Sequence, residues 1–101
     1  MMQVNMAAQL CQNEIFHPVC SENEVLAIEK ASYGRMRIGR CTATDIGLIG
    51  CGTDVTDIIS EICNGQTICH VPVNYPPLDE RYMQECGLPD AAYLEVFYKC
   101  F

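Results

Sequence analysis

Eight cysteines in a chain of only 101 residues are the feature that most limits what this protein can fold into. A chain of this length forms one domain with a modest hydrophobic core. Small extracellular domains reinforce a thin core with disulfides, so the cysteine content indicates a disulfide scaffold from a secreted, oxidising environment. The even number allows every thiol to be paired, although the spacing alone does not select one pairing.

The cysteine spacing argues against a zinc finger. The sequence contains no C-x-x-C pair, and Cys69 beside His70 does not have the spacing of zinc ligands. We expect His17 and His70 to be partly exposed residues of strands or turns. The sequence therefore predicts neither a bound metal nor another cofactor.

The charge of the chain excludes two classes of partner. Thirteen acidic and six basic residues give a formal net charge of −7, which disfavours nucleic acid and anionic membrane surfaces. No apolar run is long enough to span a bilayer, so we expect no membrane insertion. The N-terminal stretch "MMQVNMAAQL" lacks the charged and long apolar regions of a signal peptide. We therefore expect a mature secreted form or a recombinant chain, with residues 1–6 as an extension before a domain at 7–101.

Hydrophobic patterning predicts the secondary structure. Alternating or β-branched stretches indicate strands at residues 7–12, 14–20, 24–33, 67–73 and 91–100. The best helix pattern covers residues 53–63, where Thr53 would cap the N-terminus and Asn64-Gly65 would end the helix. Its apolar stripe would face the core and consists of Val55, Ile58, Ile59 and Ile62.

The remaining segment, residues 74–90, contains three prolines and is expected to be a long, ordered loop. The predicted fold class is therefore a small α/β domain. It would have an antiparallel sheet of about five strands, one main helix at about 54–62, and four disulfides.

Signals for catalysis are weak. A Cys–His nucleophile needs a free thiolate, which an oxidised scaffold does not supply. The acids Asp79, Glu80 and Glu85 fall in one predicted loop, where a solvated surface is favoured over two acids that face each other across a substrate. Motifs for calcium, phosphate or dinucleotide binding are absent from the sequence. We therefore expect that the protein is not an enzyme.

Three stretches together resemble a known family. "AIEKASYGR" followed by a cysteine, "CNGQTICHVPVN" and "AYLEVFYKC" are similar to the sea urchin egg lectin (SUEL) type domain. This family comprises the galactose- and rhamnose-binding lectins of fish and invertebrate eggs and a domain of latrophilin ectodomains. The resemblance runs from about Cys11 to Cys100 and implies a compact α/β fold. It also implies four disulfides: Cys11–Cys41, Cys20–Cys100, Cys51–Cys86 and Cys63–Cys69.

The same resemblance implies a sugar pocket beside the Tyr33-Gly34-Arg35 turn. Its contacts would include Tyr33, which offers a hydroxyl and a ring, and Asn74, whose amide offers both a donor and an acceptor. Arg35 is expected to pack its stem on the sheet and pair its guanidinium with a carboxylate. Other carbohydrate-binding positions carry residues that differ from those of typical members, and here they are Gln12, Gln84 and Glu85.

Ala92 stands where typical members have a lysine, so several charged groups of the family site are replaced. Charged groups make the stronger hydrogen bonds, so we expect a lectin for galactosyl- or rhamnosyl-type glycans with altered specificity, read partly by the loop 75–85. Weak binding of single sugars would require multivalency through a homo-oligomer. The alternative is a protein-interaction module of the adhesion type, on the same fold, that has lost sugar binding. A disulfide-rich inhibitor or toxin has only the composition in its favour.

Overall fold

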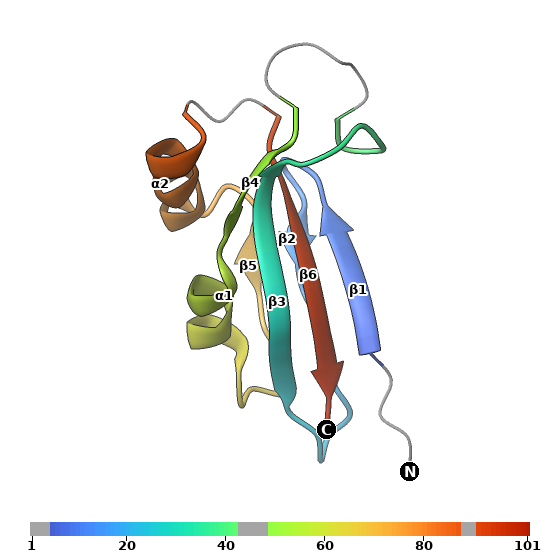
Figure 1. The fold of residues 1–101 in the computed structure, drawn as a ribbon. Coiled ribbons are helices and arrows are strands. Elements are labelled where there is room, and N and C mark those ends of the chain that lie inside the picture. The colour runs from blue at the N-terminus through green and yellow to red at the C-terminus, as the bar shows by residue number, and fades with distance from the viewer. Residues whose placement is uncertain (1–4, 43–48, 88–90) are drawn as a thin grey trace.

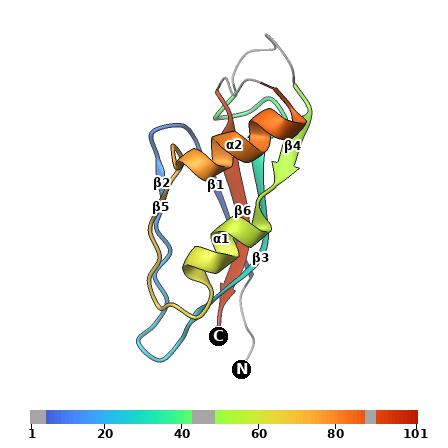
Figure 2. The ribbon, with the colours of Figure 1, turned by 90° about the vertical axis from the view of Figure 1, so that its left-hand side faces the viewer.

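The structure is a computed structural model that describes residues 5–42, 49–87 and 91–101. Its elements follow in the order β1 (Asn5–Leu10), β2 (Ile15–Phe16), β3 (Leu26–Arg35), β4 (Cys51–Asp54), α1 (Thr56–Cys63), β5 (Val71–Pro72), α2 (Pro76–Glu85) and β6 (Tyr93–Cys100). One antiparallel sheet has the strand order β1-β6-β3-β4, and β2 pairs with β5 in a second sheet. Figures 1 and 2 show both helices and the β2–β5 pair on the same side of the four-stranded sheet.

The predicted α/β class with antiparallel strands is confirmed. The five predicted strands divide between the two sheets, because residues 14–20 and 67–73 pair with each other in the smaller sheet and not with the central strands. The strand β4 was not predicted. Its sequence, Cys-Gly-Thr-Asp, has little of the β-branched and aromatic character of a strand, and its pairing with β3 supplies the missing stabilisation.

The predicted N-terminal cap of the first helix is wrong. Thr53 lies buried in β4, and Val55 occupies the cap position without a side-chain hydrogen bond. The side chain of Asp54 accepts a hydrogen bond from the backbone N–H of Thr56 at 2.9 Å. At the other end, Gly65 has a φ of +82°, so the predicted left-handed stop is confirmed.

Helix α1 presents its apolar stripe to the core, as the sequence predicts. Val55 and Ile59 are fully buried, and Ile58 and Ile62 are partly buried against the same cluster. The core lies between the helices, the second sheet and the inner face of the large sheet, where β3 contributes Tyr33.

The segment predicted as a loop is helix α2, and this expectation is corrected. Two prolines occupy the first positions of the helix, where a missing N–H group costs nothing because it has no partner in the helix. Leu78 and Tyr82, one turn apart, are 0% and 1% exposed. The ring of Tyr82 packs edge-on against Tyr33 with centroids 6.0 Å apart. The helix is thus part of the core.

All eight cysteines form disulfides, and the four pairs are those that the family resemblance implied. Cys11–Cys41 joins the end of β1 to the chain that follows β3. Cys51–Cys86 joins β4 to the end of α2. Cys20–Cys100 and Cys63–Cys69 join the second sheet to β6 and α1.

Substitution of Leu78 tests whether α2 belongs to the core. Leu78→Ala removes a fully buried side chain and should lower the free energy of unfolding by about 2–5 kcal/mol. Met83, on the same helix, is 46% exposed, so Met83→Ala should change it by less than about 0.5 kcal/mol. Denaturant unfolding of the oxidised proteins measures both. Equal losses of stability in the two variants would show that α2 does not pack against the core as described.

Candidate functional site

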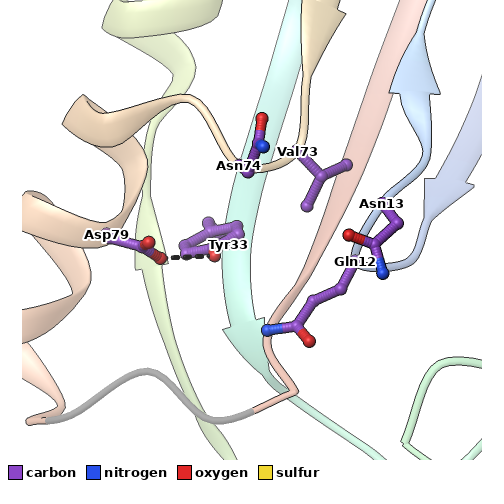
Figure 3. A pocket seen from close by; sticks show the side chains of 6 residues that line it. All are labelled: Gln12, Asn13, Tyr33, Val73, Asn74 and Asp79. Carbon is purple, nitrogen blue, oxygen red and sulfur yellow. Dashed lines mark hydrogen bonds between the residues drawn. The ribbon is translucent and has the colours of Figure 1, made fainter.

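A pocket of about 230 Å³ forms where four stretches of the chain meet. Figure 3 shows Asp79 and Tyr33 on one side, the β1–β2 turn on the other, and the residues after β5 between them. The residues that line it are Gln12, Asn13, Tyr33, Val73, Asn74 and Asp79.

Tyr33 on β3 is 2% exposed, and its hydroxyl donates a hydrogen bond to Oδ1 of Asp79 at 2.6 Å. Burial, reinforced by this hydrogen bond and by the charge of Asp79, raises the pKa of Tyr33 above its usual range. The hydroxyl therefore keeps its proton and holds the carboxylate of Asp79 at the pocket.

Glycine is required at position 34, next to Tyr33, because a side chain does not fit there. A Cβ atom at this position would lie 2.4 Å from the carbonyl oxygen of Cys51 and 2.7 Å from Cα of Gly52. The glycine thus lets β4 approach β3 closely. The next residue, Arg35, is buried at 6% exposure, and its predicted ion pair is not found among the described residues, where its Nε has no hydrogen-bond partner.

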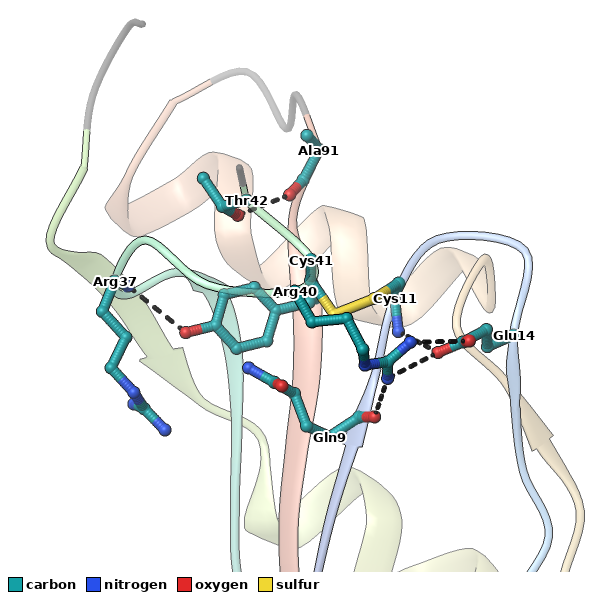
Figure 4. The surroundings of a disulfide bond; sticks show 9 residues. Gln9, Cys11, Glu14, Arg37, Arg40, Cys41, Thr42 and Ala91 are labelled. Atoms are coloured by element: carbon teal, nitrogen blue, oxygen red, sulfur yellow. Dashed lines mark hydrogen bonds and ion pairs between the residues drawn. A yellow bond between two sulfur atoms is a disulfide. The ribbon is translucent and has the colours of Figure 1, made fainter. Parts of the chain in front are cut away.

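The turn that carries Gln12 and Asn13 is fixed by several interactions (Figure 4). The backbone N–H of Glu14 donates to the carbonyl of Cys11 at 3.1 Å, and Asn13 has a φ of +69°, which asparagine tolerates better than most residues. The carboxylate of Glu14 accepts from the N–H of Cys11 at 2.6 Å and from Arg40. The hydrogen bond from Arg40 is the main reason that the pKa of Glu14 falls to about 2.

The third side of the pocket is tied to this turn through the backbone. The N–H of Val73 donates to the carbonyl of Glu14 at 3.0 Å, and the N–H of Tyr75 donates to Pro72 at 3.1 Å. Val73 is buried, which leaves the exposed amide of Asn74 as the polar group that this stretch contributes.

The structure brings three of the predicted site residues together and leaves two apart. Gln12, Tyr33 and Asn74 line the pocket, whereas Gln84 and Glu85 do not. Gln84 and Glu85 are exposed in the last turn of α2, because the helix extends the segment before Cys86 away from the pocket.

Asn13 and Asp79 line the pocket but were not predicted to do so. The signal for Asp79 was present in the sequence. Two prolines followed by an acid are typical of a first helical turn, and the apolar residues at 78 and 82 have helical spacing. For Asn13 the sequence gives only a residue type that turns favour.

The described residues that line the pocket supply one carboxylate, from Asp79, and three side-chain amides, and none of them is basic. Ala92, where the family has a lysine, is fully buried. Amides and a carboxylate can together donate to and accept from neighbouring hydroxyl groups. The site can therefore bind a neutral, hydroxyl-rich molecule by hydrogen bonds.

Residues 19–100 match a family model described as the D-galactoside/L-rhamnose binding SUEL lectin domain. The match includes Tyr33, Asn74 and Asp79, while Gln12 and Asn13 lie before its first residue. A comparison with curated proteins returned no match.

The stability that the turn at residues 11–14 contributes should depend on pH. Because the pKa of Glu14 is lowered from 4.5 to about 2, its stabilising effect is complete above the ordinary value and is lost as the pH falls towards 2. Glu14→Gln should therefore flatten the dependence of the unfolding midpoint on pH in this acidic range, compared with the parent protein.

The control is Glu22→Gln, which removes an exposed acid for which the described residues show no ion pair. This control should retain the acid dependence of the parent. An NMR titration of the Glu14 carboxyl carbon measures the pKa directly, and a midpoint near 4.5 would contradict the ion pair.

Proposed function

This chain belongs to the D-galactoside/L-rhamnose binding SUEL lectin family, whose members bind carbohydrate and are not enzymes, and we propose that its pocket binds neutral galactosyl- or rhamnosyl-type glycans. One observation carries the proposal. Gln12, Tyr33 and Asn74 are far apart in the sequence, are among the contacts that the family resemblance implies, and line one pocket.

Asn74 and Asp79 are the proposed polar contacts. The exposed amide of Asn74 can donate to one sugar hydroxyl and accept from the next. One oxygen of Asp79 is engaged by Tyr33, and the other can accept a charge-assisted hydrogen bond from the sugar. Tyr33 then acts as a positioning residue, because its hydroxyl is already used and its side chain is almost fully buried.

The proposed specificity differs from that of typical family members. Their acid after the first cysteine is Gln12 here, their Asp-Pro-Cys is Gln84-Glu85-Cys86, and Ala92 replaces their lysine. Among the described lining residues, Asp79 in the first turn of α2 supplies a carboxylate to the pocket. Because the described lining residues supply a carboxylate and no basic group, a sialylated or sulfated glycan would meet repulsion, so neutral glycans are preferred.

The setting of this activity is also a proposal. We place the lectin domain at residues 7–101 and the protein outside the cell, since four disulfides are typical of oxidising compartments. In the part of the chain that the structure describes, neither helix has the length and apolarity needed to cross a membrane. Because single sugars would bind weakly, a homo-oligomer would supply the multivalency for tight binding.

A protein-interaction module of the adhesion type is the second candidate. The observation in its favour is Ala92, which is fully buried and brings no cation to the site. Under this alternative the glycan array described below would find no ligand for the folded protein.

The first test is a glycan array with the oxidised protein, displayed multivalently. We expect signals for neutral glycans with terminal galactose or rhamnose, and weaker signals when the same glycans carry sialic acid or sulfate. A preference for the anionic forms would contradict the proposed role of the pocket charge.

The second test compares two acids on the same helix. Asp79→Asn keeps the shape of the side chain and an acceptor for Tyr33, but it removes the charged acceptor for the sugar. It should weaken binding of an array-positive glycan by about ten- to hundredfold, or about 1–3 kcal/mol. Glu85→Gln makes the same charge change outside the pocket and should leave the affinity within about twofold.

Calorimetric titration measures both affinities, and thermal unfolding verifies that both variants are folded. Asn74→Ala should weaken binding to a similar extent as Asp79→Asn. If Glu85→Gln weakens binding and Asp79→Asn does not, the sugar binds at the end of α2.

A further inference from the structure

Two histidines lie side by side next to the β2–β5 pair, His17 directly after β2 and His70 directly before β5. The rings of His17 and His70 have centroids 5.5 Å apart and planes at 71°. Both side chains are exposed. The β2–β5 sheet, which the two residues adjoin, forms one side of the molecule in Figure 2.

The register of this sheet explains why the rings meet. Backbone hydrogen bonds join the two segments at alternate positions: Glu14 with Val73, Pro18 with Cys69, and Cys20 with Thr67. His17 and His70 face each other between these positions, as a pair without mutual backbone hydrogen bonds. In antiparallel sheets, such pairs bring their side chains closest together.

The backbone under the two rings is held firmly. Cys69, next to His70, is bonded to Cys63 at the end of α1, and Cys20 is bonded to Cys100 at the end of β6. The Cα atoms of the two histidines are therefore held at a fixed separation, and only rotation of the side chains changes the distance between the rings.

The neighbours of the histidines on this face carry no charge. The outward positions on either side of the pair are Ile15, Val19, Ile68 and Pro72. Three of these are large and exposed: Ile15 at 46%, Val19 at 62% and Ile68 at 54%. The two imidazoles are thus the polar groups of a surface that is otherwise apolar.

We propose that His17 and His70 together bind one divalent transition-metal ion. Imidazole nitrogen is a good ligand for Zn²⁺, Ni²⁺ and Cu²⁺, and Cu²⁺ binds such sites most tightly. Two bonds of about 2.0 Å to one ion require the two nitrogens within about 4 Å of each other. Rings with centroids 5.5 Å apart reach this separation by rotation about their side-chain torsions.

The site is a surface site with open coordination positions. Among the described residues, no group of three or more histidine, cysteine, aspartate or glutamate side chains gathers in a way that could hold a metal. Water therefore completes the coordination sphere, and the affinity comes from the two imidazoles. All cysteines are in disulfides, so thiolates do not compete for the ion.

The test is calorimetric titration of Zn²⁺, and separately of Cu²⁺, into the oxidised protein and its His17→Gln and His70→Gln variants. We expect one site per chain, with Cu²⁺ bound more tightly than Zn²⁺. Each single variant should lose at least about tenfold in affinity, because one imidazole binds far more weakly than two on one ion. The double variant should be little weaker than either single variant, since neither single variant retains the pair.

NMR provides a second readout, because Zn²⁺ should shift the ring resonances of both histidines at the same metal concentration. Single variants that bind Zn²⁺ as tightly as the parent, or ring resonances that shift independently, would overturn the proposal. Asp79→Asn serves as the control for the glycan site and should bind metal like the parent. The two proposals can therefore fail separately.

Discussion

A disulfide between residues 80 positions apart, Cys20 and Cys100, holds the small sheet against the large one. Closing so long a loop removes much conformational freedom from the unfolded chain. The pocket depends on this connection, because Asn74 follows the small sheet while Tyr33 lies on the large one. With a thin core, hydrophobic burial alone would hold two such sheets together less firmly.

Helix α2 closes the pocket from the remaining side. Its buried residues Leu78 and Tyr82 fix its position, and the hydrogen bond from Tyr33 to Asp79 fixes the direction of the carboxylate. Tyr33 therefore connects the sheet to the helix, and its buried side chain offers little surface to a ligand. In the proposed site, the group that would bind a sugar hydroxyl is the carboxylate of Asp79, which this tyrosine holds in place.

The class of fold, the helix α1 and most strands could be predicted from the sequence, because periodicity reports which residues face a core. The cysteine spacing alone does not determine the full disulfide pairing, which the family resemblance supplied. What sequence reasoning missed depended on tertiary contacts. Thr53 has the residue type of a cap, yet pairing of β4 with β3 buries it. His17 and His70 are unrelated in sequence and meet only through the register of two strands.

The error at α2 has a different cause. Three prolines in one segment predict a loop, although at the first positions of a helix prolines are favourable. The loop prediction also placed Asp79 on a solvated surface, whereas Gln84 and Glu85 were expected at the pocket because the family resemblance aligns them before Cys86. Alignment to a cysteine locates a residue in the chain, but the helix determines where that residue lies in space.

The division of α2 into buried and outward positions makes this helix a natural place to alter ligand preference by engineering. Leu78 and Tyr82 anchor it, and Cys86 tethers its end to β4, so these positions would stay constant in a library. Outward positions such as Glu80 and Met83 do not contribute to that anchoring. If the buried positions stay constant and only the outward positions of α2 are varied, ligand preference can be changed without loss of stability.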